Sequence, residues 1–360
     1  MDDISARFYI DWPGFCLDVD LTLSGKGVTA LFGHSGSGKT TILRCVAGLE
    51  RAPVGRLVVK GETWQDDQHW LPPHQRPIGY VFQEASLFPH LSVLANLRYG
   101  MKRVAPQARG NLQASLDQAV ELLGIGKLLD RKPDCLSGGE RSRVGMARAL
   151  AVNPSILLMD EPLAALDHDR KQEILPYLAR LHDQLEMPIL YVSHAPDEVA
   201  RLADHIVVLK GGKAVAVGPL GETLARLDLP IRLGEDAGVI IDAVVGERDD
   251  TWHLVRVDFS GGSLWLRDND IPVGKRARML IVARDVSIAC EKIDSTSIQN
   301  ILPARIVEIS EDTHPSQALI RLDVGKEPMI ARLTQRAVTQ LELAPGRDVW
   351  VQIKAVALIG

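Results

Sequence analysis

The sequence lacks several features that would define a class of function. It has no surplus of basic residues, with 41 Lys and Arg against 46 Asp and Glu, and its formal net charge is −5. That balance excludes the broad positive surface that non-specific nucleic-acid binding needs, so no nucleic-acid partner is expected. No apolar run approaches the roughly 18 residues of a membrane-spanning helix, so the chain is not expected to cross a bilayer.

Cysteine is scarce and dispersed. The four cysteines are Cys16, Cys45, Cys135 and Cys290. Their wide separation fits neither closely spaced metal ligands nor a disulfide framework, which favours buried or incidental thiols. Residues 1–5 show neither the basic nor the apolar segment of an export signal, so a cytoplasmic location is expected.

What remains is an ordinary globular composition. The 360 residues are 46% apolar and 24% charged, enough for about two domains. Up to about residue 230, short apolar runs alternate with helical stretches, which predicts a wound α/β domain. Strands are expected over 28–32, 78–82, 155–159, 189–193 and 205–210, and helices over 40–47, 112–123, 138–151 and 171–184.

Beyond about residue 230 the sequence looks all-β. Strand-like runs are separated by Gly-Gly, Pro-Gly and Asp-Asn turns. The stretch 254–258 is echoed by 319–323, and 274–283 is echoed by 346–355. Two related β units, as neighbouring barrels or as one composite barrel, would explain the echo. Chance similarity between short strands is the alternative.

Residues 33–40 read GHSGSGKT, which fits the phosphate-binding pattern GxxxxGK[ST] between an expected strand and an expected helix. Lys39 is expected to reach the β- and γ-phosphates, and the Thr40 hydroxyl to bind Mg²⁺. An accidental glycine-rich turn is the alternative. The residues expected at the phosphates are Gly33, His34, Ser35, Gly36, Ser37, Gly38, Lys39, Thr40 and Thr41.

Four apolar residues, 156–159, precede the carboxylates Asp160 and Glu161. A strand buried on both faces has this pattern, and its carboxyl end meets the ligand crevice of an α/β sheet. Asp160 then suits the Mg²⁺ shell, and Glu161 suits a general base that polarises the attacking water. Considered alone, two carboxylates after a strand more often belong to a solvated turn. The phosphate-binding pattern elsewhere in the sequence makes the catalytic interpretation the favoured one.

Residues 136–140, LSGGE, and the following 141–150 resemble the signature motif and helix of ATP-binding-cassette (ABC) ATPases, with Glu140 in place of the usual Gln. A Ser and two Gly at a helix N-terminus make a second anion site. Gln83 looks like the Q-loop glutamine of that family, residues 165–167 like its D-loop, and His194 like its switch histidine.

The resemblance implies a homodimer in which two cassettes, head to tail, enclose two ATP molecules. It implies catalytic roles for Glu161, His194 and Gln83, and Mg²⁺ contacts from Thr40, Gln83 and Asp160. The other subunit's phosphate contacts would be Ser137, Gly138 and Gly139. The family also stacks an aromatic ring on adenine, for which Trp12 is the candidate and Phe15 and Tyr9 are the alternatives.

Residues 296–360 resemble the small molybdate-binding (Mop) domain of molybdate importer ATPases. A tetrahedral dianion calls for hydroxyl, amide and cationic donors. Ala337 and Ala355 stand where Mop domains often carry hydroxyl residues, so a dimerising β module is the alternative reading. The candidate oxyanion-binding residues are Ser297, Asn300, Arg305, Thr334 and Lys354.

The expected fold is an α/β P-loop ABC ATPase domain with a helical subdomain (1–230), followed by a C-terminal all-β, OB-like small barrel domain. The latter comprises a linker and first β unit (231–295) and a Mop or TOBE-like unit (296–360). By resemblance the chain energises molybdate uptake, using ATP and Mg²⁺. The alternatives are another oxyanion (tungstate, sulfate or thiosulfate), another small solute, or a non-transport ATPase with an oxyanion-sensing β module.

The expected partners follow from an importer with separate membrane subunits. Two integral-membrane permease subunits would bind the surface around 83–94, and an extracytoplasmic substrate-binding protein would act indirectly. The chain would then be peripheral on the cytoplasmic face of the inner membrane.

Overall fold

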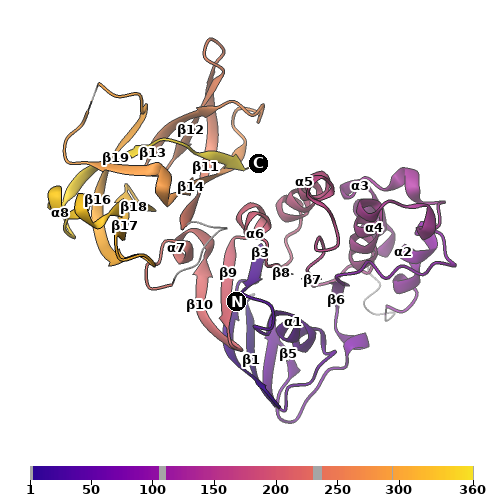
Figure 1. Cartoon of the computed structure of the whole chain (residues 1–360). Coiled ribbons are helices and arrows are strands. Elements are labelled where there is room, and N and C mark those ends of the chain that lie inside the picture. Colours follow the sequence, from indigo (N-terminus) through magenta and orange to yellow (C-terminus); the bar gives the residue numbers. More distant parts are fainter. Residues whose placement is uncertain (1–2, 105–110, 230–236, 294, 360) are drawn as a thin grey trace. The chain divides into compact units, whose positions relative to one another are not determined.

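The computed structural model describes residues 3–104, 111–229, 237–293 and 295–359. The chain divides into two compact units, Met1–His194 with Leu202–Val217, and Ala195–Arg201 with Gly218–Gly360 (Figure 1). The domain boundary expected at residue 230 lies outside the described residues. Across the described ranges, no helix combines the length and the apolar character that a membrane span needs.

A ten-stranded sheet forms the first unit, in the order β5-β4-β1-β2-β10-β9-β3-β8-β7-β6. The strands are β1 (Ile4–Trp12), β2 (Phe15–Leu23), β3 (Val28–Phe32), β4 (Val54–Val59), β5 (Glu62–Gln65), β6 (Ile78–Val81), β7 (Ile156–Asp160), β8 (Ile189–Val192), β9 (His205–Lys210) and β10 (Lys213–Pro219). β1 pairs antiparallel with β2 and β4, an antiparallel half that the expected strands did not include.

The parallel half of this sheet positions the chemistry. β3 pairs in parallel with β8 and β9, and β7 with β6 and β8. Residues 156–159 of β7 are buried, as expected for a strand covered on both faces. Because the carboxyl ends of parallel strands meet at one edge, the segments after β3, β7 and β8 come together there.

The helices of the chain are α1 (Lys39–Ala47), α2 (Val93–Met101), α3 (Leu112–Leu122), α4 (Gly138–Leu150), α5 (His168–Gln184), α6 (Pro196–Leu202), α7 (Leu220–Leu224) and α8 (Gln335–Gln340). α4 contacts α2, α3 and α5, which makes it the central helix of the helical subdomain. The expected strands and helices of the first unit are confirmed, with ends that differ by at most three residues.

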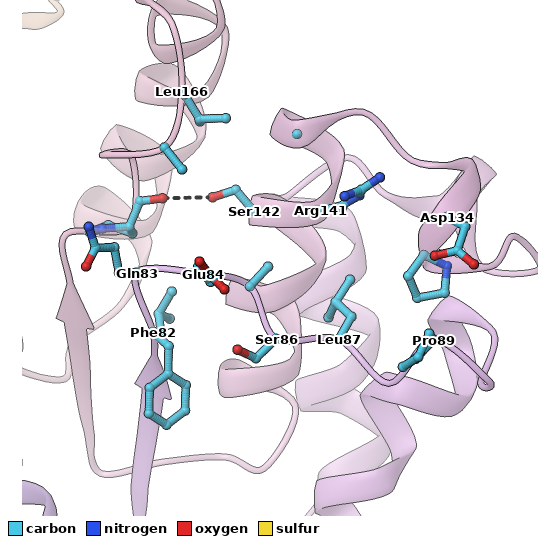
Figure 2. A pocket seen from close by; sticks show the side chains of 16 residues that line it. Phe82, Gln83, Glu84, Ser86, Leu87, Pro89, Asp134, Arg141, Ser142 and Leu166 are labelled. Atoms are coloured by element: carbon cyan, nitrogen blue, oxygen red, sulfur yellow. Dashed lines mark hydrogen bonds between the residues drawn. The ribbon is translucent and has the colours of Figure 1, made fainter.

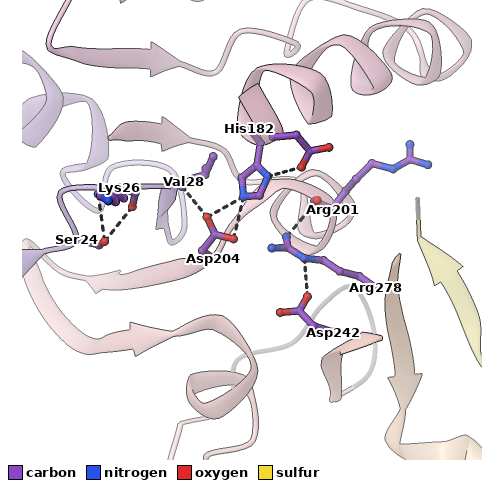
Figure 3. A network of polar contacts seen from close by, with 9 residues as sticks. Ser24, Lys26, Val28, His182, Arg201, Asp204, Asp242 and Arg278 are labelled. Carbon is purple, nitrogen blue, oxygen red and sulfur yellow. Dashed lines mark hydrogen bonds and ion pairs between the residues drawn. The ribbon is translucent and has the colours of Figure 1, made fainter. Parts of the chain in front are cut away.

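Asp204 ties the start of β3 to α5 within the first unit (Figure 3). Its Oδ2 accepts the Val28 N–H at 2.8 Å and lies 2.8 Å from His182 Nε2. A Cβ at Gly27 would lie 2.3 Å from that oxygen, so only glycine leaves room for it. In the second unit, Arg278 donates to Asp242 and to the Arg201 carbonyl, which fastens α6 to the strand β14 (Arg276–Val282).

The second unit contains two five-stranded sheets, β13-β12-β11-β14-β20 and β15-β19-β16-β17-β18. Besides β14, its strands are β11 (Gly238–Asp249), β12 (Leu254–Phe259), β13 (Gly262–Arg267), β15 (Val286–Ala289), β16 (Asn300–Glu311), β17 (Gln317–Val324), β18 (Glu327–Thr334), β19 (Asp348–Ile353) and β20 (Ala357–Ile359). Apolar side chains from both sheets share one buried core.

The echo in the sequence has a counterpart in the topology. The two sheets have matching strand orders when the first is followed from β13 and the second from β18. The orders are then β13-β12-β11-β14 and β18-β17-β16-β19. The fifth strand of each sheet is exchanged, since β15 follows β14 in the chain but pairs with β19, and β20 follows β19 but pairs with β14. The two β units are therefore interlocked halves of one module.

The two halves also share a backbone irregularity. The register of β11 against β12 shifts part-way along, as does that of β16 against β17. Beside each shift, a glycine N–H donates to a strand carbonyl at 2.7 Å, Gly274 to Val245 and Gly346 to Ile306. A bulge kept with the same hydrogen bond in both halves makes chance similarity a poor explanation of the repeat.

Candidate functional site

The loop between β3 and α1 has the conformation of a phosphate cradle. Gly36 and Gly38 have φ values of 79° and 102°, which side chains with a Cβ rarely adopt. Lys39 is buried, and its Nζ donates to the carbonyls of Gly33 at 2.8 Å and His34 at 3.0 Å. The loop thus holds its own cation at the N-terminus of α1, where an anion is favoured.

A pocket opens beside this loop. It is lined by Phe15, Ser35, Gly36, Gly38, Lys39, Thr40, Thr41 and Glu161. Within the described residues, the buried Ser37 Oγ finds no hydrogen-bond partner. A glycine-rich cradle, a buried cation and an unsatisfied hydroxyl fit the phosphates of a nucleotide.

Asp160, at the end of β7, meets Thr40 at the start of α1. Thr40 Oγ1 donates to Asp160 Oδ1 at 2.9 Å, and the Tyr80 hydroxyl on β6 donates to Asp160 Oδ2 at 3.3 Å. A hydroxyl and a carboxylate oxygen side by side are ligands that Mg²⁺ accepts, beside substrate phosphates. The donor set therefore fits the expected Mg²⁺, with Tyr80 orienting the carboxylate from behind.

The electrostatics of these two charges follow from burial. Desolvation lowers the pKa of Lys39, although the neighbouring carboxylates Glu161 and Asp160 oppose the shift. Desolvation also raises the pKa of Asp160, against the hydrogen bonds from Thr40 and Tyr80. Both groups are thus held where their charge is poorly solvated and a complementary ligand would stabilise it.

Glu161 directly follows β7 and faces His194 after β8. The His194 Nδ1 and Glu161 Oε1 atoms are 3.2 Å apart. Glu161 has a φ of 45°, a left-handed conformation unusual for a side chain of its size. Its N–H donates to the Val192 carbonyl at 3.0 Å, which fixes the strained turn against β8. Glu161 also lines the phosphate-loop pocket, so the carboxylate reaches the same space as Lys39.

Gln83 lies in a different pocket, shown in Figure 2. That pocket is formed by residues 81–87 and Pro89, by α4 with the turn before it, and by the turn after Glu161. Ser142 of α4 donates to the Pro162 carbonyl across it at 3.2 Å. The Gln83 side chain is exposed and is not among the residues that line the phosphate-loop pocket.

The residues of the signature motif begin α4. Ser137 is the N-cap, and its Oγ accepts the Glu140 N–H at 3.2 Å while a Glu140 carboxylate oxygen accepts the Ser137 N–H at 2.7 Å. This reciprocal pair is a capping box, and it lowers the pKa of Glu140 through the hydrogen bond from Ser137. Ser137 is exposed and Gly139 is buried, while Gly138 lines the Gln83 pocket.

Two aromatic rings lie next to the phosphate loop. Phe15 lines the pocket, and its ring stacks on that of Trp12 with centroids 6.3 Å apart. Trp12, at the end of β1, is 39% exposed, a large fraction for an indole without a partner molecule. Tyr9 is farther back on β1 and is also exposed. The structure thus brings Trp12 and Phe15, the first candidate and an alternative, together.

The five candidate oxyanion residues do not converge within one chain. In the pairing of β16 with β19, Asn300 lies opposite Ile353 and Arg305 opposite Asp348. At about 3.3 Å per residue, these positions are roughly 16 Å apart. Arg305 pairs with Asp348 at 3.0 Å, and Thr334 caps α8 by accepting the Ala337 N–H.

The other three candidates lie near one end of β16, but Asn300 has a different task. Its Oδ1 accepts the Trp265 N–H at 2.8 Å, and its Nδ2 donates to the Trp265 carbonyl at 3.0 Å. These bonds join β16 to β13 of the other sheet, so the amide is engaged in holding the module together. Ser297 is exposed, and Lys354 is exposed directly after β19.

Two family models match the chain, ABC transporter over residues 16–164 and TOBE domain over residues 296–360. Over 359 residues and the full length of both chains, it is 66% identical to the molybdenum import ATP-binding protein ModC of Methylococcus capsulatus. It belongs to the family of molybdenum import ATP-binding proteins. The ModC of Thiobacillus denitrificans is also 66% identical, covering 99% of this chain and 98% of its own.

Among solved structures, cbiO1 of Clostridium perfringens, part of the ABC transporter complex cbiONQ, matches with a TM-score of 0.55 and 26% identity. The match covers 63% of this chain and 92% of cbiO1. The expected fold class, an ABC ATPase domain followed by an all-β domain, is confirmed by these matches and by the sheets described above.

Two residues of the site carry no signal in the sequence of this chain. Tyr80 reads as one apolar residue in a strand, and only the pairing of β6 with β7 shows that its hydroxyl reaches Asp160. Arg148 reads as a charge on a helix, and only the fold shows that it donates to the loop after Gln83.

Proposed function

We propose that this chain is the ATP-hydrolysing subunit of an importer that takes up molybdate through a separate permease. The observation that carries the substrate is the full-length similarity to molybdenum import ATP-binding proteins. The pocket that joins Lys39, Thr40 and Glu161 supports the hydrolysis. ATP is the substrate of this pocket, and Thr40, Asp160 and Gln83 would hold Mg²⁺.

In this proposal the phosphate loop positions the nucleotide. The backbone N–H groups of residues 33–41 bind the phosphate oxygens, as nests at helix N-termini do. The Lys39 ammonium leaves the carbonyls of Gly33 and His34 for the β- and γ-phosphates, which offer it full negative charges in place of dipoles. Mg²⁺, when bound, neutralises charge on the phosphate oxygens.

Glu161 acts as the general base toward the attacking water, and His194 positions the Glu161 carboxylate. The 3.2 Å contact between the two side chains fixes the carboxylate at the edge of the pocket. Gln83 reaches the γ-phosphate and the water when its loop moves toward the nucleotide. The reaction then depends on alignment and on charge stabilisation, as phosphoryl transfer to water requires.

The nucleotide site is completed by a second copy of the chain. Ser137, Gly138 and Gly139 present the N-terminus of α4, and in a head-to-tail homodimer they face the γ-phosphate held by the partner. The Trp12 indole covers the adenine, with Phe15 behind it. These contacts make dimer formation dependent on ATP.

The permease binds where the helical subdomain is hollowed. One pocket lies around Gln83, and another is lined by His90, Leu91, Ser92, Leu94, Ala95, Arg98, Tyr99 and Lys102. Both border the segment 83–94, which suits a helix of a membrane subunit. The chain is then peripheral on the cytoplasmic face of the inner membrane, with two permease subunits, and an extracytoplasmic binding protein supplies the solute.

The β module takes the oxyanion in this proposal through Lys354 and Ser297, whose exposed side chains lie near one end of β16. Asn300 supports that end through Trp265, whereas Arg305 and Thr334 would contribute only from a second copy. A purely dimerising role for the module is the alternative.

The experiment is ATP hydrolysis by the complex of this chain with its permease, stimulated by a binding protein loaded with molybdate, tungstate or sulfate. Stimulation by the molybdate-loaded protein alone supports the proposal. Stimulation by the sulfate-loaded protein without stimulation by molybdate would replace the substrate. A chain that never sediments with permease-containing membranes would exclude the transport role.

A further inference from the structure

Helix α4 is joined to the loop after Gln83 by one arginine. Arg148 Nη1 donates to the Ser86 carbonyl at 2.9 Å, and its Nη2 donates to the Ala85 carbonyl at 3.1 Å. The planar guanidinium presents two parallel donors, and two consecutive carbonyls accept them. The loop is therefore fixed in orientation as well as in position.

The backbone of the loop is shaped for this contact. Ser86 has a φ of 40°, a left-handed conformation that costs a residue with a side chain on the order of 1 kcal/mol. Gly145, one turn before Arg148, brings α4 against Ala85, since a Cβ there would already touch the Ala85 Cβ at 3.4 Å. The loop thus lies directly on α4.

The other end of the loop is held by α2. Asn96 is fully buried, its Oδ1 accepts the Phe88 N–H at 2.8 Å, and its Nδ2 donates to the Phe88 carbonyl at 3.1 Å. Arg148 also lies over the Phe88 ring, 5.6 Å from its centroid. Gln83 is therefore followed by a loop with two fixed points, of which Arg148 holds the nearer.

The same helix also holds the loop that follows the catalytic carboxylate of Glu161. Ser142 Oγ donates to the Pro162 carbonyl, one residue beyond Glu161. α4 thus contacts the segments that follow both Gln83 and Glu161, and it begins with Ser137. A displacement of α4 would reach both loops at once.

We propose that Arg148 is a positioning residue for Gln83, which locks the loop 83–89 to the signature helix so that the two move together. The inference rests on the proposed ATPase function. It means that a permease pressing on this loop displaces α4, and that closure of α4 on a nucleotide displaces the loop. Arg148 itself is not among the residues that line the phosphate-loop pocket.

Arg143 provides a matched control on the same helix. Its Nη1 donates to the Leu123 carbonyl at 2.9 Å, and its guanidinium lies 4.7 Å from the Tyr177 ring centroid. Both arginines are half-buried, contact backbone carbonyls and lie over an aromatic ring. Only Arg148 contacts the loop after Gln83.

The test uses the full chain with Arg148→Met, Arg143→Met, Gln83→Ala and the double variant Gln83→Ala/Arg148→Met. Amide hydrogen exchange of residues 83–90 reports the lock without any nucleotide. Steady-state hydrolysis gives kcat and KM for ATP, and thermal unfolding reports global stability. If Arg148→Met does not fold, Arg148→Lys replaces it, because Lys keeps the charge without the planar pair of donors.

The expected results separate positioning from stability. Arg148→Met speeds exchange in 83–90 and lowers kcat about tenfold, while KM changes less than about twofold. In the Gln83→Ala background it lowers kcat no further, because the residue it positions is gone. Arg143→Met leaves exchange in 83–90 and kcat close to wild type.

Three results would overturn the inference. These are unchanged exchange in 83–90, an Arg148→Met kcat equal to that of Arg143→Met, and an undiminished effect of Arg148→Met on top of Gln83→Ala. A wild-type chain without ATP hydrolysis would instead refute the proposed function, and exchange in 83–90 would still decide whether the lock exists.

Discussion

Thr40 and Asp160, 120 positions apart in the sequence, are joined by a 2.9 Å hydrogen bond between Oγ1 and Oδ1. The contact brings the start of α1 to the end of β7, so that the phosphate loop and the acidic strand end act on one point. The other carboxylate oxygen, Oδ2, accepts a hydrogen bond from the Tyr80 hydroxyl at 3.3 Å. Both carboxylate oxygens are thus oriented before any metal arrives.

Tyr80→Phe tests whether this orientation matters. Removing the hydroxyl leaves Oδ2 free to rotate, and the loss of an outer partner of a metal ligand typically lowers metal affinity about 10-fold or more. We expect a higher Mg²⁺ concentration for half-maximal hydrolysis, with kcat at saturating Mg²⁺ close to wild type. Direct Mn²⁺ binding in the presence of ATP, measured by electron paramagnetic resonance, should weaken in parallel.

Tyr99→Phe is the control for that variant, because the Tyr99 hydroxyl also takes part in a hydrogen bond. It accepts one from Arg103 at 2.9 Å. Tyr99→Phe should leave the Mg²⁺ dependence unchanged. Equal Mg²⁺ dependence in Tyr80→Phe and wild type would show that Thr40 alone orients Asp160.

Glu161→Gln removes the proposed base while keeping the shape of the side chain. A general base contributes about 10²- to 10⁴-fold, so turnover should fall at least 100-fold. ATP binding and ATP-dependent dimer formation should persist, because Gln removes a negative charge next to the phosphates. Single-turnover hydrolysis and size-exclusion chromatography with ATP check both expectations.

Glu173→Gln, on the exposed face of α5, is the matched control and should behave as wild type. Near-normal hydrolysis in Glu161→Gln would exclude Glu161 as the base and would leave the charges and positioning groups to activate the water.

Trp12→Ala and Phe15→Ala distinguish the two stacked rings. Loss of an aromatic platform under a base costs about 1–3 kcal/mol, which corresponds to a KM for ATP raised about 5- to 150-fold in Trp12→Ala. Phe15 lines the phosphate end of the pocket, so Phe15→Ala should change KM for ATP and for GTP alike. A larger rise in the KM for ATP in Phe15→Ala than in Trp12→Ala would reverse the assignment.

The parallel half of the first unit could be predicted from the sequence because its signals are local. The run 156–159 is apolar on both faces and ends in carboxylates, and residues 33–40 form a glycine pattern with a strand before it and a helix after it. Each signal depends on neighbours in the chain, so the expected parallel strands match the observed ones to within one residue at each end, and the glycine-rich loop lies between β3 and α1 as expected.

What could not be predicted depends on contacts between distant segments. The strand exchange of β15 and β20 requires knowledge of which edge each short strand finds, and neither strand carries that information in four or three residues. Likewise, the sequence alone suggests that the Asn300 amide donates a hydrogen bond to an anion, whereas in the structure this amide is bonded to the backbone of Trp265. A side chain's type is local, but its partner is set by the fold.

Glu140 gives a pH dependence. The Ser137 N–H holds the pKa of Glu140 below its ordinary value of 4.5, so the folded state favours the carboxylate. Its contribution to stability is present above the unfolded pKa and is lost as pH falls through the folded pKa. We expect Glu140→Ala to lower the free energy of unfolding by roughly 0.5–1 kcal/mol at pH 7, the size of a helix cap, and by less at pH 3.

Glu140→Gln is the control, because Gln also completes a capping box but does not titrate. Its stability relative to Glu140→Ala should be independent of pH. Chemical unfolding at pH 7, 5 and 3 measures all three proteins, and a Glu140→Ala deficit as large at pH 3 as at pH 7 would show that the charge of Glu140 is not what stabilises α4.

Asn300→Ala decides between a structural and a ligand role for the β module's amide. The substitution removes both hydrogen bonds to the half-buried backbone of Trp265, and each lost bond costs about 0.5–1.5 kcal/mol. We therefore expect a clear drop in the midpoint of thermal unfolding of the second unit. Arg305→Ala, which breaks only an exposed ion pair with Asp348, should leave that midpoint unchanged.

Titration of the full chain with molybdate, followed calorimetrically, completes the comparison. If Lys354→Ala abolishes binding while Asn300→Ala only lowers stability, the amide is structural and the lysine is the anion contact. If Asn300→Ala unfolds at the wild-type temperature and loses molybdate, the amide is a ligand, and its bonds to Trp265 are dispensable.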